Sequence, residues 1–306
     1  MKKARVLVVG SYATGLVMEV PRLPSRGETL IGRGYREVHG GKGSNQAVQA
    51  ARLGADTAFL VRVGADARGA AMEALMREEG VRPDGILRDA DRPTGVGFIV
   101  VDAAGHNLIT VDPGANGALD AADLEAHRGL FEEAGVVVAQ LEIPLPTALA
   151  AMRIGRACGA RTILNPAPAA DLSGHDLSCV DFLTPNETET LVCAAMPAAP
   201  LEAAMRRLKE RGCGHVVTTT GEQGCLWLDA GEKLRAVPGF RVAAVDTVGA
   251  GDAFAGAFAV GLGEGLPPET ALRFAHAAAA LSVTRPDTIP SYHRRAEVER
   301  FFRERA

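Results

Sequence analysis

Short apolar runs that alternate with helical segments constrain the fold of this 306-residue chain more than any other feature. The first run, Val6-Leu7-Val8-Val9, is followed by Gly10, and a β-branched run that ends in this way is typical of a buried strand in a parallel sheet. Similar runs lie at 57–63, 135–141, 161–165, 180–184 and 215–220. The alternation predicts one large α/β domain, because strands separated by helices assemble into a parallel sheet that those helices cover.

Two stretches interrupt the alternation because they contain strand patterns and no helix. These strand patterns lie at 16–20, 29–32, 94–101 and 107–112. The last two flank Asp102-Ala103-Ala104-Gly105, which is typical of a hairpin turn. We expect the two patches, at about 12–39 and 94–112, to pair into one small β-sheet lid. The lid would be inserted in a single domain of residues 1–306.

Polar residues recur where the predicted strands of the main sheet end. They are Glu142, Asn165, Asn186, Glu189 and Thr219, with Gly221 close by. The carboxyl ends of parallel strands form the edge at which open α/β sheets bind ligands. Each residue alone could be an ordinary loop or cap residue, but together they predict a polar rim along this edge.

A glycine-rich segment, Asp246-Thr247-Val248-Gly249-Ala250-Gly251-Asp252, leads into an apolar helix. The unpaired N–H groups and the dipole at such a helix N-terminus favour phosphate oxygens. A carboxylate repels phosphate, so Asp252 is unexpected in an anion site unless it takes a proton from a hydroxyl that attacks phosphorus. The alternative is that Asp252 only caps the helix.

A second glycine-rich segment, Gly40-Gly41-Lys42-Gly43-Ser44-Asn45, opens another helix. Its glycines allow the backbone to approach a ligand closely, and Lys42 and Asn45 can donate hydrogen bonds there. The spacing does not match a P-loop, and no G-x-G-x-x-G dinucleotide motif follows a strand.

Composition excludes several classes of function. The chain is 47% apolar with a net charge of −4, and its Lys and Arg residues are scattered, so we expect no nucleic-acid partner. Its five cysteines have no C-x-x-C spacing, which favours reduced thiols. No apolar run approaches the length of a membrane span. We therefore expect a cytoplasmic protein that does not bind membranes.

The two glycine-rich segments, 246–254 and 40–47, resemble the two signatures of the ribokinase family, the PfkB-type carbohydrate kinases. Three lesser stretches, 165–169, 184–189 and 238–242, resemble the ribokinase branch of that family. The resemblance covers residues 6–302 in order. It implies a three-layer α/β sandwich with a mostly parallel central sheet, helices on both faces and a small β-sheet lid. It also implies transfer of the γ-phosphoryl group of ATP to a hydroxyl of a small sugar or polyol.

The resemblance further implies a role for each matching position. Asp252 matches the catalytic base, and the anion hole matches Gly249, Ala250 and Gly251. The sugar-binding positions match Gly41, Lys42, Asn45, Glu142 and Asp252. The ATP-binding positions match Asn186, Thr219, Gly221, Gly251 and His276. Glu189 matches a residue that organises Mg²⁺ through water, and a K⁺ site matches Asp246, Val248 and Val283. Family members often dimerise through the lid, so we expect a homodimer.

The chain departs from the family pattern at two places. Ala13 and Gly15 occupy positions where ribose-specific members carry an Asn and an Asp that hold the sugar's ring hydroxyls. Losing that carboxylate should reduce discrimination in favour of ribose, so we expect a different sugar or polyol. The second departure is Arg285-Pro286-Asp287-Thr288, where the family has a Gly-containing loop beside the K⁺ site.

A sugar or polyol kinase has three alternatives. A non-catalytic sensor on the same fold would bind nucleotide or ligand without turnover, but it would have no need for a base at Asp252. A nucleoside or sugar-acid kinase belongs to the same class of enzyme. A dinucleotide-dependent oxidoreductase is disfavoured because its glycine fingerprint is missing after the first strand.

Overall fold

A nine-stranded sheet forms the centre of the computed structural model, which describes residues 3–104 and 106–305. The strand order is β13-β12-β11-β10-β9-β8-β1-β4-β5. The strands are β1 (Arg5–Val9), β4 (Asp56–Gly64), β5 (Ile86–Asp89), β8 (Val136–Gln140), β9 (Arg161–Asn165), β10 (Phe182–Leu183), β11 (His215–Thr219), β12 (Gly224–Leu228) and β13 (Leu234–Pro238). Pairing is parallel from β5 to β11 and antiparallel for β12 and β13. The predicted, mostly parallel sheet is confirmed.

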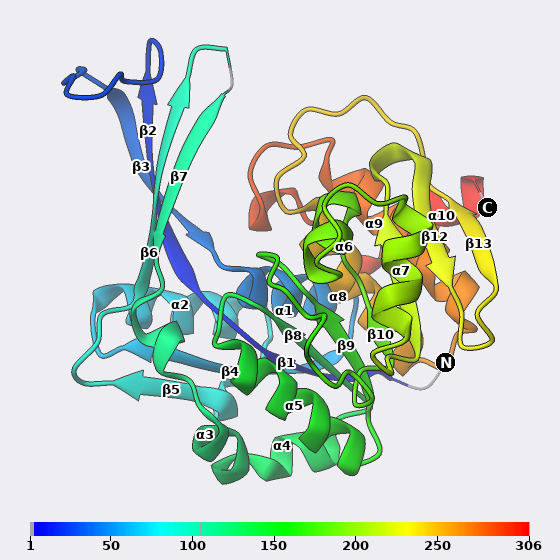
Figure 1. Ribbon diagram of the computed structural model, residues 1–306. Coiled ribbons are helices and arrows are strands. Elements are labelled where there is room, and N and C mark those ends of the chain that lie inside the picture. The colour runs from blue at the N-terminus through cyan, green and yellow to red at the C-terminus, as the bar shows by residue number, and fades with distance from the viewer. Residues whose placement is uncertain (1–2, 105, 306) are drawn as a thin grey trace.

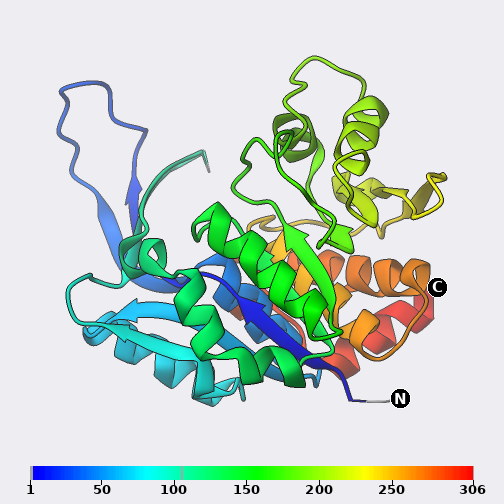
Figure 2. The same cartoon turned by 60° about the horizontal axis from the view of Figure 1, so that its bottom comes forward.

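Helices cover both faces of this sheet and make the predicted three layers (Figures 1 and 2). One face carries α1 (Lys42–Arg52), α2 (Ala67–Glu78), α8 (Ala250–Gly263), α9 (Pro268–Ser282) and α10 (Arg295–Arg305). The other carries α3 (Ala121–Ala126), α4 (Arg128–Glu133), α5 (Leu145–Ala157), α6 (Glu187–Cys193) and α7 (Leu201–Lys209). Within β1, Val6 and Val8 enter the first core and Leu7 and Val9 the second, because side chains alternate along a strand.

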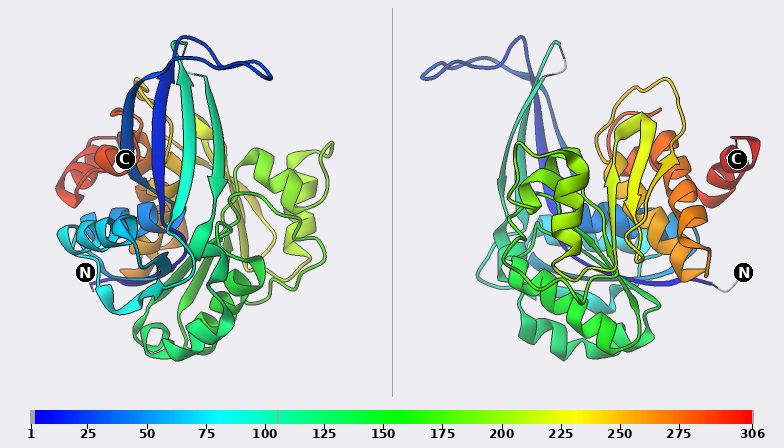
Figure 3. Two further views of the ribbon diagram at one scale, coloured as in Figure 1. Left: turned by 90° about the vertical axis from the view of Figure 1, so that its left-hand side faces the viewer. Right: turned by 45° about the vertical axis from the view of Figure 1, so that its right-hand side comes forward.

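The helix-free stretches form a separate four-stranded sheet, which we call the lid (Figures 1 and 3). Its order is β3-β2-β6-β7, with β2 (Ala13–Val20), β3 (Arg33–Gly40), β6 (Gly95–Asp102) and β7 (Asn107–Asp112). The two patches pair through β2 and β6, as predicted. The strand expected at 29–32 was wrong, since the strand that pairs with β2 lies at 33–40. Gly105, in the predicted hairpin turn, lies outside the described residues.

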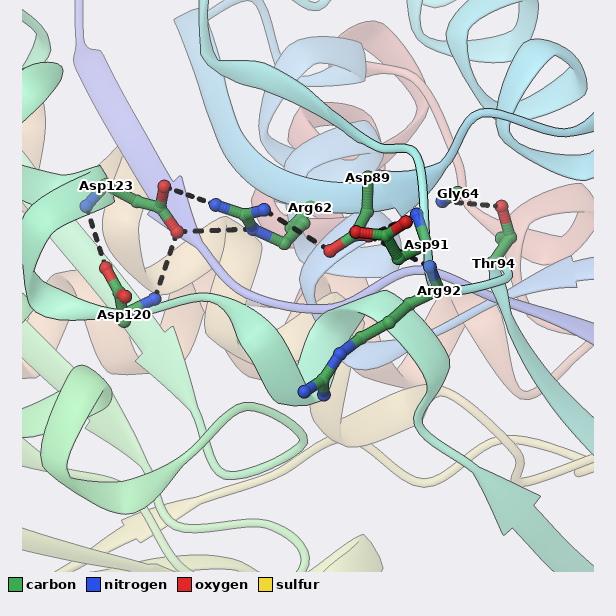
Figure 4. Close-up of polar contacts among 8 residues, drawn as sticks. All are labelled: Arg62, Gly64, Asp89, Asp91, Arg92, Thr94, Asp120 and Asp123. Atoms are coloured by element: carbon green, nitrogen blue, oxygen red, sulfur yellow. Dashed lines mark hydrogen bonds and ion pairs between the residues drawn. The ribbon is translucent and has the colours of Figure 1, made fainter.

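A polar cluster fixes the base of the lid to the main sheet (Figure 4). Arg62, on β4, contacts Asp123 of α3 at 3.2 Å and Asp89, at the end of β5, at 3.3 Å. Asp89 also accepts two backbone N–H groups of the following turn. Thr94, one residue before β6, accepts the N–H of Gly64 at 3.0 Å. The segment that leads into β6 is thereby held against β4 and α3.

The C-terminal helix α10 packs mainly on α9. Phe302 of α10 contacts Phe274 of α9 edge-on, with ring centroids 6.0 Å apart. Phe301 contacts Phe240, which follows β13, with ring centroids 5.4 Å apart. Among the helices of residues 3–104 and 106–305, none is both long and apolar enough to span a membrane.

Candidate active site

The N-terminus of α8 is open to a ligand. Gly249, which precedes α8, has φ 79° and ψ 0°, a left-handed conformation that suits glycine. A Cβ at Gly249 would lie 2.7 Å from the hydroxyl oxygen of Tyr292, whereas a Cβ at Gly251 would have no neighbour within 4 Å. The Tyr292 hydroxyl donates to the Gly249 carbonyl at 3.1 Å, and burial raises the pKa of Tyr292 well above its usual value, so this donor keeps its proton. Protein packs against one side of this turn and leaves the Gly251 side exposed.

Asp252 lies in the first turn of α8, with only 5% of its surface exposed. Its two carboxylate oxygens accept hydrogen bonds from Asn45 Nδ2 at 2.8 Å and from Gln46 Nε2 at 3.0 Å. Gly249 occupies the N-cap position, and no side chain caps the helix. The capping interpretation of Asp252 is therefore wrong, because its carboxylate faces the amides of α1.

A chain of buried amides continues from Asp252 into the core. Gln46 Nε2 also contacts Asn165 Oδ1 at 3.1 Å, and Gln46 Oε1 accepts from Gln140 Nε2 at 2.7 Å. Asn165 Nδ2 in turn donates to the carbonyl of Thr184 at 2.8 Å. These bonds fix which end of the Gln46 amide faces Asp252. Neither Gln46 nor Gln140 was predicted from the sequence, although a glutamine beside Ala47 and Val48 on a buried helix face is a detectable signal.

Lys42 lies near the carboxylates of both Asp252 and Glu142. Glu142 Oε2 accepts the Ser11 hydroxyl at 2.5 Å and the backbone N–H of Lys42 at 2.8 Å. Burial opposes the charge of Lys42, but the carboxylates of Asp252, Glu142 and Glu189 outweigh it and raise the pKa of the Lys42 amine. The structure thus brings Lys42, Asn45, Glu142 and Asp252 together, and Lys42 stays protonated at neutral pH.

The fold itself requires two glycines of the 40–45 segment. A Cβ at Gly41, where φ is 93°, would lie 2.7 Å from Tyr12 Cα, and a Cβ at Gly43 would lie 2.5 Å from the Ser11 nitrogen. Both glycines are therefore required by close packing against the β1–β2 connection. Ligand approach is not needed to explain them.

A cavity of about 500 Å³ lies on the exposed side of Gly251. Its polar lining includes all five residues expected at the nucleotide: Asn186, Thr219, Gly221, Gly251 and His276. Its apolar lining includes Phe240, Val242, Phe254, Ala279, Ala280 and Val283. Of these apolar residues, only Val283 had been assigned a site role from the sequence, and that role was at a metal. A cavity with apolar walls and a few polar groups at one end suits an aromatic base linked to a polar group.

Asn186 and Glu189 hold each other at the start of α6. The Asn186 side chain accepts the N–H of Glu189, and the Glu189 carboxylate accepts the N–H of Asn186, both at 2.8 Å. Burial raises the pKa of Glu189, while the bond from Asn186 and the charge of Lys42 act against that rise. This capping box fixes both side chains at the edge of the cavity.

Two of the expected K⁺ ligands, Asp246 and Val248, lie just before α8, and the third, Val283, follows α9. Asp246 accepts the N–H groups of Val248 and Asp287, each at 3.0 Å. The Val283 carbonyl accepts the N–H groups of Val245 and Asp246 at 2.7 and 3.2 Å. Asp287 has φ 65°, the left-handed conformation for which glycine is favoured. Within the described part of the chain, no group of three or more His, Cys, Asp and Glu side chains is arranged to hold a metal ion.

His276 is expected to make the stability of the protein depend on pH. Burial lowers the pKa of His276 to about 4, and its Nε2 has no hydrogen-bond partner among the described residues. Between about pH 4 and 6.5 the unfolded chain binds a proton that the folded chain does not, so stability falls as pH falls. The loss should approach about 3 kcal/mol at pH 4. Urea unfolding of wild type and His276→Asn from pH 4 to 7 measures it, and equal pH slopes would contradict the assignment.

Comparisons with known proteins identify the family. The family model described as pfkB family carbohydrate kinase matches residues 3–295. The chain belongs to this family. Ribokinase from Haemophilus influenzae is 36% identical over 297 residues, covering 96% of this chain and 97% of that protein. Deoxyribokinase from Salmonella typhimurium is 35% identical over 291 residues, covering 94% of this chain and 95% of that protein.

Solved structures of the family have the same fold. Ribokinase from Thermotoga maritima has a TM-score of 0.89 at 33% identity, covering 98% of this chain and 99% of that one. Ribokinase from Arabidopsis thaliana, solved with ribose and ATP, gives the same four values. The sequence-based expectation of an ATP-dependent carbohydrate kinase is confirmed, and the non-catalytic sensor is not favoured.

Proposed function

We propose that Asp252 is the base that takes the proton from an acceptor hydroxyl as this kinase transfers the γ-phosphoryl group of ATP to a small sugar or polyol. The observation that carries the proposal is the position of Asp252. It lies one residue after Gly251, which lines the cavity, and it contacts Asn45 beside Lys42 and Glu142. A hydroxyl at Asp252 would therefore face a phosphate held at the N-terminus of α8.

The surrounding groups suit phosphoryl transfer, which needs positioning and charge stabilisation more than covalent chemistry. The backbone N–H groups of Gly249, Ala250 and Gly251 would stabilise charge on the transferred phosphoryl oxygens. Lys42 would hold the acceptor or neutralise developing negative charge. The amides of Asn45 and Gln46 keep the Asp252 carboxylate oriented for its proton.

ATP would occupy the cavity, with its base between the apolar walls and its phosphates toward Gly251. His276, neutral because burial lowers its pKa to about 4, would present Nε2 as a hydrogen-bonding atom. Asn186 lies at the phosphate end beside Glu189. Glu189 would hold Mg²⁺ through water, and Mg²⁺ neutralises phosphate charge in such reactions. The Arabidopsis ribokinase, which was solved with ribose and ATP, supports ATP as the nucleotide.

A monovalent cation such as K⁺ would bind next to the anion hole. The Asp246 carboxylate can accept more than the two N–H groups that it holds, and the Val248 carbonyl is a second candidate ligand. The Val283 carbonyl already accepts two N–H groups and would have to release one to bind an ion.

The acceptor is proposed to differ from ribose. Ala13 and Gly15, at the base of the lid, offer no side-chain hydrogen bond, and similar curated proteins include both a ribokinase and a deoxyribokinase. A nucleoside or a sugar acid is the alternative acceptor. The carboxylates of Asp252, Glu142 and Glu189 around Lys42 disfavour an anionic acceptor.

The whole chain is proposed to act as one kinase domain in the cytoplasm, with the lid inserted in it. All five cysteines are free thiols, which suits a reducing compartment. The lid exposes large apolar side chains, including Met18 at 40% and Phe98 at 56%, which supports dimerisation through it. Neither nucleic acid nor membrane is proposed as a partner.

An acceptor panel tests the proposed reaction. ADP formation is measured with ATP, Mg²⁺ and K⁺ in the presence of pentoses, deoxypentoses, hexoses, polyols, sugar acids or nucleosides. We expect one small neutral sugar or polyol to raise ADP formation at least tenfold over the rate without acceptor. ATP that binds but is consumed at one rate with every acceptor would contradict the proposal.

A further inference from the structure

We infer that the preferred acceptor is a deoxygenated sugar, which presents a C–H edge in place of a hydroxyl to the underside of the lid. The inference rests on the proposed function, because it concerns the acceptor at Asp252.

Strand register defines the two faces of the lid. In the pairing of β2 with its neighbours, Gly15 is opposite Val38 of β3 and Gly97 of β6. Ala13 is opposite Gly40 and Gly95 in the same way. Residues directly opposite each other point to one face, and every second residue along a strand shares that face. One face near the base of the lid therefore consists of Ala13, Gly15, Val38, Gly40, Gly95, Gly97 and Ile99, and we call it the inner face.

Contacts on both faces show that the inner face is turned toward Asp252. On the other face, Glu37 of β3 is 3.1 Å from Arg68 of α2. Arg36, which shares its face with Val38, has its guanidinium 3.8 Å from Asp287. The N–H of Asp287 donates to Asp246, which begins the segment that leads to Asp252. The inner face and the N-terminus of α8 thus lie on the same side of the lid. Figures 1 and 3 place the rest of the main sheet's carboxyl edge on that side as well.

Apolar side chains line the inner face around Gly15. A Cβ added at Gly15 would lie 2.8 Å from Val38 Cγ2 and 3.3 Å from Ile99 Cδ1. These two side chains therefore flank Gly15 and leave no free space for a longer polar residue there. The backbone N–H and C=O groups of this part of β2 pair with β3 and β6. Apart from Arg36, whose guanidinium lies 3.8 Å from Asp287, the inner face near its base offers an acceptor no polar side chain.

The floor of the site has the opposite character. Lys42, Asn45 and Asp252 present a cation, an amide and a carboxylate below the lid. An acceptor hydroxyl that faces this floor can form hydrogen bonds with these side chains. A hydroxyl that contacts Val38 and Ile99 loses its hydrogen bonds to water and gains none from the protein. Burying one unpaired hydroxyl in this way lowers kcat/KM about tenfold to a hundredfold. The missing oxygen of the preferred acceptor should therefore be the one nearest the lid.

Matched acceptors that differ by one hydroxyl test the inference. We compare kcat/KM for ribose with that for each of its monodeoxy analogues, using ADP formation with ATP and Mg²⁺. One monodeoxy analogue should exceed ribose at least tenfold. Phosphorylation in which ribose is the best of the set overturns this inference and leaves the proposed kinase reaction intact. No acceptor-dependent ADP formation with any sugar overturns both.

A variant pair assigns the selectivity to the inner face. Val38→Thr keeps the volume of the side chain and adds a hydroxyl beside Gly15, so the deoxy-to-ribose ratio of kcat/KM should fall at least threefold. Val100→Thr makes the same change on the opposite face, since Val100 follows Ile99 on β6 and pairs with Met18. That control should keep the wild-type ratio. Equal ratios in both variants and wild type would show that Val38 does not select the acceptor.

Discussion

Replacing Asp252 by Asn lowers kcat by about a hundredfold or more, the scale expected for a general base, while the affinity for ATP changes little. The substitution keeps the size of the side chain and removes the site that accepts the proton. It also places an amide opposite the donors of Asn45 and Gln46, so one hydrogen bond of the pair must be lost. Steady-state kinetics gives the effect on kcat, and calorimetric titration with ATP gives the affinity.

A control separates the chemical loss from loss of structure. Gln46→Glu removes one donor to Asp252 and leaves the Asp252 carboxylate in place, so its effect reports orientation and charge. Thermal unfolding of both variants shows whether the fold persists. A variant Asp252→Asn that folds, binds ATP and turns over at close to the wild-type rate would disprove the assignment of the base.

Replacing Gly249 by Ala should reduce both activity and stability. At φ 79° an alanine is strained, and its Cβ would lie 2.7 Å from the Tyr292 hydroxyl and 2.9 Å from Thr288 Cγ2. The turn must shift, which displaces the N–H groups proposed to hold the phosphoryl oxygens. Loss of one such donor lowers kcat by about a hundredfold to a thousandfold in other enzymes. The strain should lower the free energy of unfolding by about 1–3 kcal/mol.

Two companion variants identify the cause. Gly249→Ala combined with Tyr292→Phe removes the closest clash and should recover part of the unfolding free energy. Gly251→Ala meets no atom within 4 Å of its new Cβ and should leave that free energy unchanged or raised. Urea unfolding and kcat are measured for all three variants. Wild-type stability and kcat in Gly249→Ala would show that the left-handed turn is not required.

The sheet and the lid could be predicted because their sequence patterns are local. The run that forms β1 and the pairs of lid strands each have their own periodicity, so the sequence alone predicts that they are strands. Strand β3, Arg33–Gly40, could not, because its residues are mostly polar and exposed. Its extended backbone is stabilised by pairing with β2, the preceding strand, across the connection 21–32. The antiparallel strands β12 and β13, a short hairpin at the sheet edge, were not predicted.

The candidate site likewise contains residues that a local sequence pattern predicts and residues that it does not. Lys42, Asn45 and Asp252 lie in two continuous signatures, so the resemblance identified them. Gln140, two residues before Glu142, could not be recognised, since its role depends on a contact with Gln46 94 residues away.

The meaning of Gly15 also depended on three-dimensional contacts. The sequence shows that a carboxylate is missing there, but only the fold shows that Val38 and Ile99 flank the glycine. For that reason, introducing the Asn and the Asp of ribose-specific members by Ala13→Asn and Gly15→Asp would need Val38→Ala as well to make room.

The central claim is that the group leaving ATP is transferred to an acceptor alcohol held at Asp252. Phosphorus-31 NMR of a reaction with ATP, Mg²⁺ and the best acceptor of the panel tests it most directly. We predict a new phosphomonoester signal that grows in equal amount with ADP, and that grows about a hundredfold more slowly or less in Asp252→Asn. ADP accompanied only by inorganic phosphate would mean that water, and not a sugar hydroxyl, receives the phosphoryl group, and would contradict the claim.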